Sequence, residues 1–542
     1  MSKLVVLTAI AVFASLIFQA FLQPIDFIPV STSFLSWMPM LYWVALVVAI
    51  LLWVITLAIR LKDYAAYSVL VLLVGVIFFG IELAERYPRY GDTYAFMYMT
   101  NYVLNGFSQQ NPVLPYLENW PGWFDFMSAF KSVSGLGYYD SAKAMLVIFQ
   151  FIGLVLSIAL GKAIFKNQRS TFIFSSIVVS LMPWVFVDIA PYVFGALLMV
   201  VVIYTLRNTG TSKAIFLFII LFLSSTISHG LTALVILVYV MALLLLFLGA
   251  KMMTSEKRDL AIHLKMKHLV LIPILVFGTW GLVSPFVENN LQFFVGTIAG
   301  LGTTPITYQS GYLTVFRLPA VLSGAVYLIL LALVMAIAAY GTRNRLSSSL
   351  LPLVPAGVIV LVVYFFPFTA QDLYDRVIQA VYPLLAWFVT LAIANMARGQ
   401  RARLVCVALI PVLLVVGFVF FYSHEGVLVF PQTELAGDTY LDLHTPNNTI
   451  VGYFSLAPAP ATLANTPMQP ITVFQLVYGA PDLGHQLSMS SILVSSRMVT
   501  NSLQYYYGSN IVSHYIDAHM LNLVYDSNNY ATFLRVNDDD RN

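Results

Sequence analysis

Long apolar runs, separated by short polar stretches, dominate the pattern of hydrophobic and polar positions along the chain. A helix needs about 20 apolar residues to cross roughly 30 Å of hydrocarbon. Each run therefore predicts a membrane-spanning helix. The pattern predicts thirteen spans, near residues 4–22, 38–59, 64–84, 143–165, 171–187, 190–206, 214–229, 231–250, 268–286, 319–341, 350–368, 378–396 and 404–422.

Three segments are expected to lie outside the lipid: a loop at 85–142, a Gly- and Thr-rich loop at 287–318, and a tail at 423–542. We predict a transmembrane domain at 1–422 followed by a small extracellular mixed α/β domain at 423–542. In the tail, a helical-looking segment at 487–507 is flanked by β-prone runs at 427–430, 449–454, 471–478, 521–525 and 531–536.

The composition agrees with a polytopic membrane protein. Of 542 residues, 60% are hydrophobic and 9% are charged, whereas a soluble domain is about a quarter charged. This composition excludes a disordered protein, a nucleic-acid binder and an ordinary cytosolic enzyme. The single cysteine, Cys406, excludes an intrachain disulfide. Lys3 precedes the first apolar run without a clear cleavage site after it, which indicates an uncleaved anchor rather than a signal peptide.

The basic residues predict the orientation of the spans, because cytoplasmic loops are rich in Lys and Arg. With a cytoplasmic N-terminus, the inner side holds eighteen of the 27 basic residues and three of the 24 acidic ones. The first long loop and the tail then face outward. We expect a multi-pass plasma-membrane protein with an extracellular C-terminal domain.

Asp92 is the most informative residue of the first outer loop. It lies in the run ELAERYPRYGDTYAF, which also holds Glu85, Arg86 and Arg89. Asp92 comes just before an apolar-aromatic stretch rather than on a polar face. A carboxylate held there can act as a general base toward a hydroxyl, or help to hold a divalent cation such as Mg²⁺ or Mn²⁺. The alternative interpretation is a solvated acidic rim.

Aromatic residues gather farther along the same loop, where Trp120 and Trp123 flank Pro121 and Gly122. Aromatic residues at this density are typical of a helix that lies in the headgroup layer. Their alternative role is contact with a substrate.

Arginines beside outer span ends are candidate ligands of a phosphate. A guanidinium holds a phosphate through two parallel hydrogen bonds. Arg376 precedes the twelfth span, Arg317 precedes the tenth, and Arg86 and Arg89 follow the third. The competing interpretation pairs Arg376 with Asp372 or Asp375.

His229, at the end of the seventh span, and Asp188, between the fifth and sixth spans, complete the candidates. Each is either a catalytic group or a structural one: a hydrogen-bonded histidine at a helix break, or the polar tip of a hairpin. With Asp92 and Arg376 they all fall at the predicted outer surface. Transporters commonly place such groups at mid-bilayer instead.

The chain resembles the GT-C superfamily of polytopic membrane glycosyltransferases, especially uncharacterised archaeal proteins of that type. The resemblance rests on RYGDTYAF, WPGWF, APYVFGALL, SHGLTAL, DRVIQAVYPLL and NLVYDSNNYATFLR. It implies an enzyme that takes a sugar from a polyprenyl-phosphate carrier at the outer face. By this resemblance Asp92 is the base or metal ligand, Glu85 and Asp188 are lesser candidates, and Arg376 meets the lipid phosphate.

The hypothesis from the sequence is therefore an inverting transfer of a sugar from a lipid-linked donor, with membrane lipid as the surrounding partner. The alternatives are a lipid or glycan transporter, a non-catalytic envelope protein of the same architecture, and a polymerase or ligase of the O-antigen type. Donor sugar, acceptor and protein partners are not encoded in any recognisable motif.

Overall fold

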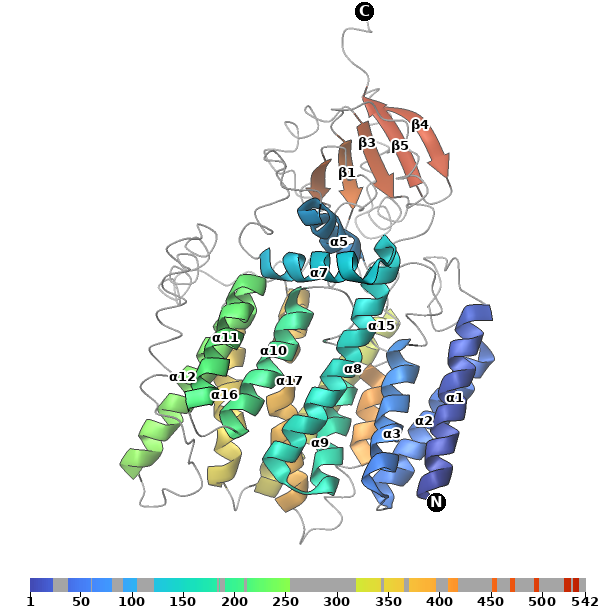
Figure 1. Ribbon diagram of the computed structural model, residues 1–542. Coiled ribbons are helices and arrows are strands. Elements are labelled where there is room, and N and C mark those ends of the chain that lie inside the picture. The colour runs from blue at the N-terminus through green and yellow to red at the C-terminus, as the bar shows by residue number, and fades with distance from the viewer. Residues whose placement is uncertain are drawn as a thin grey trace, which may run out of the picture.

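The computed structural model describes residues 1–22, 38–59, 61–79, 91–104, 121–182, 185, 191–208, 212–253, 318–342, 346–364, 370–395 and 408–417, and five strands between 451 and 535. Most of the described chain is a bundle of long apolar helices (Figure 1). The bundle helices are α1 (Ser2–Leu22), α2 (Met40–Ala58), α3 (Asp63–Val74), α8 (Tyr138–Phe165), α9 (Gln168–Leu181), α10 (Pro191–Asn208), α11 (Ser212–Ser228), α12 (Gly230–Met253), α15 (Leu318–Thr342), α16 (Leu346–Tyr364) and α17 (Ala370–Asn395).

Helices cover twelve of the thirteen predicted spans, counting the short helix Ala408–Gly417, and the span at 268–286 lies outside the described residues. Among the described residues, four helical segments are long and apolar enough to cross a membrane: Ser2–Gln19, Met40–Ala58, Tyr139–Phe165 and Ile378–Asn395. The chain is thus a multi-pass membrane protein. The count of thirteen spans and the side on which each terminus lies stay predictions.

The core of the bundle is apolar, and several of its polar side chains are hydrogen-bonded within one helix or between neighbouring helices. Thr56 Oγ1 donates to the carbonyl of Leu52 in the preceding turn, at 2.7 Å. Trp53 Nε1 donates to Ser176 Oγ across the α2–α9 interface, at 2.8 Å. Within the described part of the chain, the buried polar side chains are serine, threonine and glutamine, and none is charged. Such groups bind helices together at little desolvation cost.

A π-helical turn, η2 (Gly75–Phe79), follows α3. Gly75 lets this turn lie against α1, because a Cβ atom there would collide with the ring of Phe13. The chain then enters the segment that carries Glu85.

Two shorter helices lie at one end of the bundle. Figure 1 shows α7 (Pro121–Ser134) running across the ends of the bundle helices, with α5 (Gly91–Leu104) on it. We call this end the α7 end, and the opposite end, where the N-terminus lies, the N-terminal end. The position of α7 agrees with a helix along the membrane surface.

The tail holds a five-stranded mixed sheet, which Figure 1 shows beyond α5 at the α7 end. Its strand order is β2-β1-β3-β5-β4, with β1 parallel to β2 and β3, and β5 antiparallel to β3 and β4. The strands are β1 (Val451–Ser455), β2 (Met468–Thr472), β3 (Ile492–Ser496), β4 (Leu521–Ser527) and β5 (Tyr530–Arg535).

The helix predicted at 487–507 is wrong where β3 lies, at Ile492–Ser496. The run ILVSS is rich in β-branched and small residues, and as the middle strand of the sheet it pairs with β1 and β5. Pairing on both sides outweighs a weak helical pattern. The strand predicted at 427–430 lies outside the described residues, and the boundaries of the tail domain stay predictions.

Candidate active site

The α7 helix is anchored on the bundle by aromatic packing. The side chains of Trp123 and Phe124 have exposed fractions of 0%. The ring of Trp123 lies 5.6 Å from that of Phe149 on α8 and 5.9 Å from that of Phe194 on α10. Its indole Nε1 is buried without a hydrogen-bond partner. Trp123 therefore packs inside the protein instead of in the headgroup layer, and contact of this side chain with a substrate stays a prediction.

The α5 helix is held on α7 by polar contacts. Ser128 Oγ donates to the carbonyl of Thr100 at 3.1 Å, and Lys131 Nζ donates to Asn101 Oδ1 at 2.5 Å. Burial lowers the pKa of Lys131 from its usual value. These contacts set the place of α5, which carries Asp92 in its first turn.

The start of α7 abuts the end of α11. A Cβ atom added to Gly122 would lie 2.8 Å from Cγ1 of Ile227 and 3.1 Å from Oγ of Ser228. The absence of a side chain at Gly122 therefore lets α7 approach the corner between α11 and α12. His229 is the residue at this corner.

His229 is half-buried and hydrogen-bonded to the first turn of α12. Its Nδ1 lies 2.8 Å from Oγ1 of Thr232. The backbone N–H of Thr232 donates in turn to the carbonyl of His229, at 3.1 Å. A Cβ atom at Gly195 would collide with Oγ1 of Thr232, so glycine lets α10 pack directly on this pair.

The His229–Thr232 pair opens into a hollow of about 310 Å³ between α10, α12 and α17, which we call the histidine hollow. Its polar lining consists of Tyr192, His229, Thr232 and Gln379. Hydroxyl, imidazole and amide groups of this kind can donate and accept hydrogen bonds to the hydroxyls of a sugar. The lining residues are Tyr192, Gly195, Ala196, Met199, His229, Thr232, Val235, Gln379 and Ala380.

The α17 helix connects the histidine hollow to Arg376. Residues three apart lie on the same face of an α-helix, so Arg376 is placed on the face of Gln379, one turn nearer the start of α17. The hydroxyl of Tyr382 donates to the carbonyl of Ala196 at 3.3 Å and ties α17 to α10. Pro383 lacks the N–H that would donate to the carbonyl of Gln379 in a regular helix.

The structure describes the side chains of only some of the predicted site residues. His229 lies in the histidine hollow and Trp123 under α7. Asp92 lies on α5 and Arg376 on α17, and their side chains are outside the described part. Glu85, Arg86, Arg89, Trp120, Asp188 and Arg317 lie outside the described residues.

Sequence reasoning missed Tyr192, Gly195, Thr232 and Gln379. Thr232 follows His229 by three residues, a spacing that pairs side chains at a helix start. The others reach the hollow from α10 and α17. All four lie in runs on which the resemblance rests, APYVFGALL, SHGLTAL and DRVIQAVYPLL, but nothing in these runs marks them as site residues. Among the described residues no three of His, Cys, Asp and Glu form a group that could hold a metal. A cation bound by Asp92 stays an expectation.

No protein-family model and no curated protein matches the chain. Among solved structures, it is similar to ArnT from Cupriavidus metallidurans in the apo state. The TM-score is 0.51 at 13% identity, over 87% of this chain and 98% of that chain. ArnT bound to undecaprenyl phosphate matches with a TM-score of 0.44 at 11% identity, over 92% of this chain and 99% of that one. The likeness to the apo structure shows that the chain shares the fold of ArnT, and membership of the GT-C superfamily and its archaeal type stay predictions.

Proposed function

We propose that the chain is a membrane glycosyltransferase that moves a sugar from a polyprenyl-phosphate donor to an acceptor at the outer face. The acceptor hydroxyl gives its proton to the carboxylate of Asp92 and attacks the anomeric carbon. The bond between that carbon and the phosphate oxygen breaks, and its electron pair stays on the polyprenyl phosphate. Attack from the opposite side inverts the anomeric centre.

The observation that carries this proposal is the histidine hollow. His229, Thr232 and Gln379 present hydrogen-bonding groups in one half-open space at the α7 end. We assign them to the hydroxyls of the donor sugar. Arg376, one turn away on α17, is assigned to the phosphate of the carrier. The shared fold with ArnT and the sequence resemblance both support this assignment.

The role of Asp92 is supported by the contacts of the helix that carries it. The α5 helix contacts α7, and α7 contacts the α11–α12 corner beside His229. This chain of contacts supports a carboxylate near the donor. General-base help of this kind is worth about 10²–10⁴-fold in rate. A preorganised charge at the leaving phosphate adds about 10²–10³-fold.

The test is sugar transfer in membranes that contain the protein. Radiolabelled polyprenyl-phospho-glucose and polyprenyl-phospho-mannose serve as donors, and label that becomes insoluble in organic solvent is counted. Asp92→Asn is expected to lower transfer by about 10²–10⁴-fold while the protein still accumulates. Asp125→Asn is the matched control, because Asp125 is exposed on α7 in the same predicted loop.

Equal loss in both variants, or full transfer by Asp92→Asn, would remove Asp92 from the mechanism. Movement of labelled lipid between leaflets of proteoliposomes without any glycosylated product would favour a transporter instead.

A further inference from the structure

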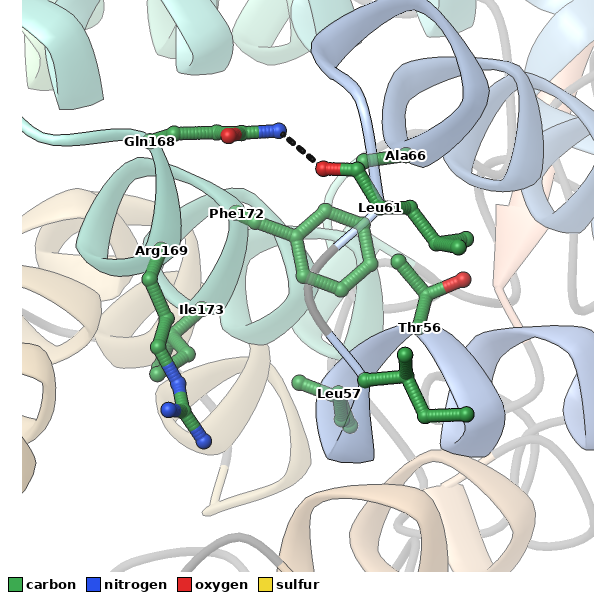
Figure 2. A pocket seen from close by; sticks show the side chains of 9 residues that line it. Thr56, Leu57, Leu61, Ala66, Gln168, Arg169, Phe172 and Ile173 are labelled. Carbon is green, nitrogen blue, oxygen red and sulfur yellow. Dashed lines mark hydrogen bonds between the residues drawn. The ribbon is translucent and has the colours of Figure 1, made fainter. Parts of the chain in front are cut away.

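A second hollow lies at the N-terminal end, between α2, α3 and α9 (Figure 2). It is a half-open space of about 400 Å³, part of which is open to solvent, and we call it the α9 hollow. Figure 2 shows the ring of Phe172 among these side chains and the guanidinium of Arg169 directed away from the Gln168–Leu61 hydrogen bond. The lining residues are Thr56, Leu57, Ile59, Leu61, Ala66, Gln168, Arg169, Phe172 and Ile173.

The α9 hollow is mostly apolar, and one hydrogen bond joins the elements beside it. Gln168 Nε2 donates to the carbonyl of Leu61 at 3.0 Å, joining the start of α9 to the α2–α3 connection. The hydroxyl of Thr56 is bonded within α2, to the carbonyl of Leu52. The hollow therefore offers an aliphatic surface next to the guanidinium of Arg169.

The α9 hollow adjoins exposed apolar side chains at the end of α2. Ile55 on α2 has an exposed fraction of 39%, and Ile59, the extended residue just after α2 that also lines the hollow, one of 44%. Exposed aliphatic side chains along a membrane helix are typical of a face toward lipid tails. A hydrocarbon chain that lies along this end of α2 would meet the hollow at Ile59.

Basic residues surround the same end of the bundle. Arg169 lines the hollow, and Lys62 and Lys166 follow Leu61 and precede Gln168 in the chain; all three side chains are exposed. One acid, Asp63, follows Lys62 in the first turn of α3. The guanidinium binds a phosphate through two parallel hydrogen bonds, and the two ammonium groups add attraction for a net negative charge.

We propose that the α9 hollow binds one anionic glycerophospholipid, with its phosphate on Arg169 and the start of an acyl chain among Leu57, Ile59 and Phe172. By the charge asymmetry of the loops this lipid comes from the cytoplasmic leaflet. Its site is at the opposite end of the bundle from the histidine hollow, and it is independent of the proposed transfer.

The experiment measures lipid binding to the purified, delipidated full chain. Palmitoyl-oleoyl phosphatidylglycerol is compared with the phosphatidylcholine of the same chains by native mass spectrometry and by the shift in Tm. The wild type is expected to retain one phosphatidylglycerol and to gain Tm with it. Arg169→Gln is expected to weaken its binding by about fivefold, the effect of one basic group near an anionic surface.

Two further variants separate the site from the general charge. Ile59→Trp fills the hollow from its exposed rim and is expected to weaken phosphatidylglycerol binding while Arg169 is kept. Arg207→Gln removes the same charge from the last turn of α10, which packs on α8, α11 and α12, and is expected to bind like the wild type.

The proposal fails if Arg169→Gln and Ile59→Trp both bind phosphatidylglycerol like the wild type, or if phosphatidylcholine binds equally well. It also fails if undecaprenyl phosphate binds in an Arg169-dependent manner and phosphatidylglycerol does not, because the hollow would then be a prenyl-lipid site. Where Arg169→Gln does not fold, Ile59→Trp decides. If the wild type transfers no sugar in the membrane assay, the proposed function is overturned, and the lipid-binding proposal is unaffected.

Discussion

The two ends of the helix bundle hold hollows that differ in the kind of polar group that lines them. At the α7 end, the histidine hollow presents imidazole, hydroxyl and amide groups and is bordered by a helix packed on aromatic rings. At the N-terminal end, the α9 hollow combines aliphatic side chains with Gln168 and the guanidinium of Arg169. Neutral hydrogen-bonding groups suit the hydroxyls of a sugar, whereas a cation beside aliphatic side chains suits an anionic lipid. Both hollows are mostly apolar, so the type of polar group, and not its share of the surface, distinguishes the two ends.

The largest effect is expected where the aromatic anchor of α7 is removed. Trp123→Ala deletes a fully buried indole between Phe149 and Phe194. It should lower the free energy of unfolding by about 3–5 kcal/mol, measured by denaturant titration in detergent. Phe126→Ala is the control, because its side chain is 39% exposed and should cost less. Equal losses would show that α7 is not anchored through Trp123.

The assignment of the phosphate to the α7 end predicts a large kinetic effect at α17. Arg376→Gln should lower sugar transfer by about 10²–10³-fold through lost stabilisation of the leaving phosphate. Arg376→Lys should keep part of the activity, since an ammonium retains the charge without the paired hydrogen bonds. Arg207→Gln should transfer like the wild type in the same membrane assay. A lysine variant no better than the glutamine variant would indicate a structural role for Arg376.

The close approach of α10 to the His229–Thr232 pair predicts a smaller loss. Gly195→Ala places a methyl group against Oγ1 of Thr232 and should destabilise the protein by about 1–3 kcal/mol through overpacking. The hollow would be distorted and transfer would fall with it. Gly357→Ala on α16 is the matched change, because no atom lies within 4 Å of the added Cβ.

The control should therefore raise Tm slightly, by the gain of about 0.5–1 kcal/mol for alanine over glycine in a helix. If both variants changed Tm in the same direction, the packing argument at Gly195 would be wrong.

The smallest effect is expected at the N-terminal end. Gln168→Ala removes the hydrogen bond to the carbonyl of Leu61 and should cost about 0.5–1.5 kcal/mol. Ser68→Ala serves as the control, because Ser68 Oγ donates only to the carbonyl of Tyr64 in its own helix. Its loss should be close to zero, and thermal unfolding of the two variants side by side measures the difference. A loss at Gln168 as large as that of Trp123→Ala would erase the contrast between the ends.

Hydropathy predicted the bundle well and the helix starts poorly. The helix α17 begins at Ala370, eight residues before the span predicted at 378–396. Its first turns, AQDLYDRVIQ, are rich in polar residues, so a search for apolar runs does not include them. The backbone hydrogen bonds of the helix nevertheless begin there. The π-helical turn at Gly75–Phe79 is as apolar as the α-helix before it, so hydropathy does not distinguish the two. Strands β1, β4 and β5 were predicted within two residues at their starts, because their β-branched and aromatic runs are compact.

The candidate site was predictable only in part, for a different reason. His229 stood out because a histidine at a break between two apolar runs is conspicuous in the sequence. Thr232, Gln379 and Tyr192 look ordinary, and they matter only because α10, α12 and α17 meet at one place. Convergence of helices far apart in the chain depends on packing, which no local pattern encodes. The side chains of Asp92 and Arg376 are outside the described part of the chain, so their convergence on one site stays a prediction.

The π-helical turn Gly75–Phe79 gives the protein a means of rotating the segment that comes after it. Such a turn carries one residue more than an α-helical turn, and each residue advances an α-helix by about 100° around its axis. Deleting a single residue there would therefore be expected to turn the chain that follows Phe79 by about that angle relative to α3. A change of length at this turn is thus expected to alter that direction more than a substitution would.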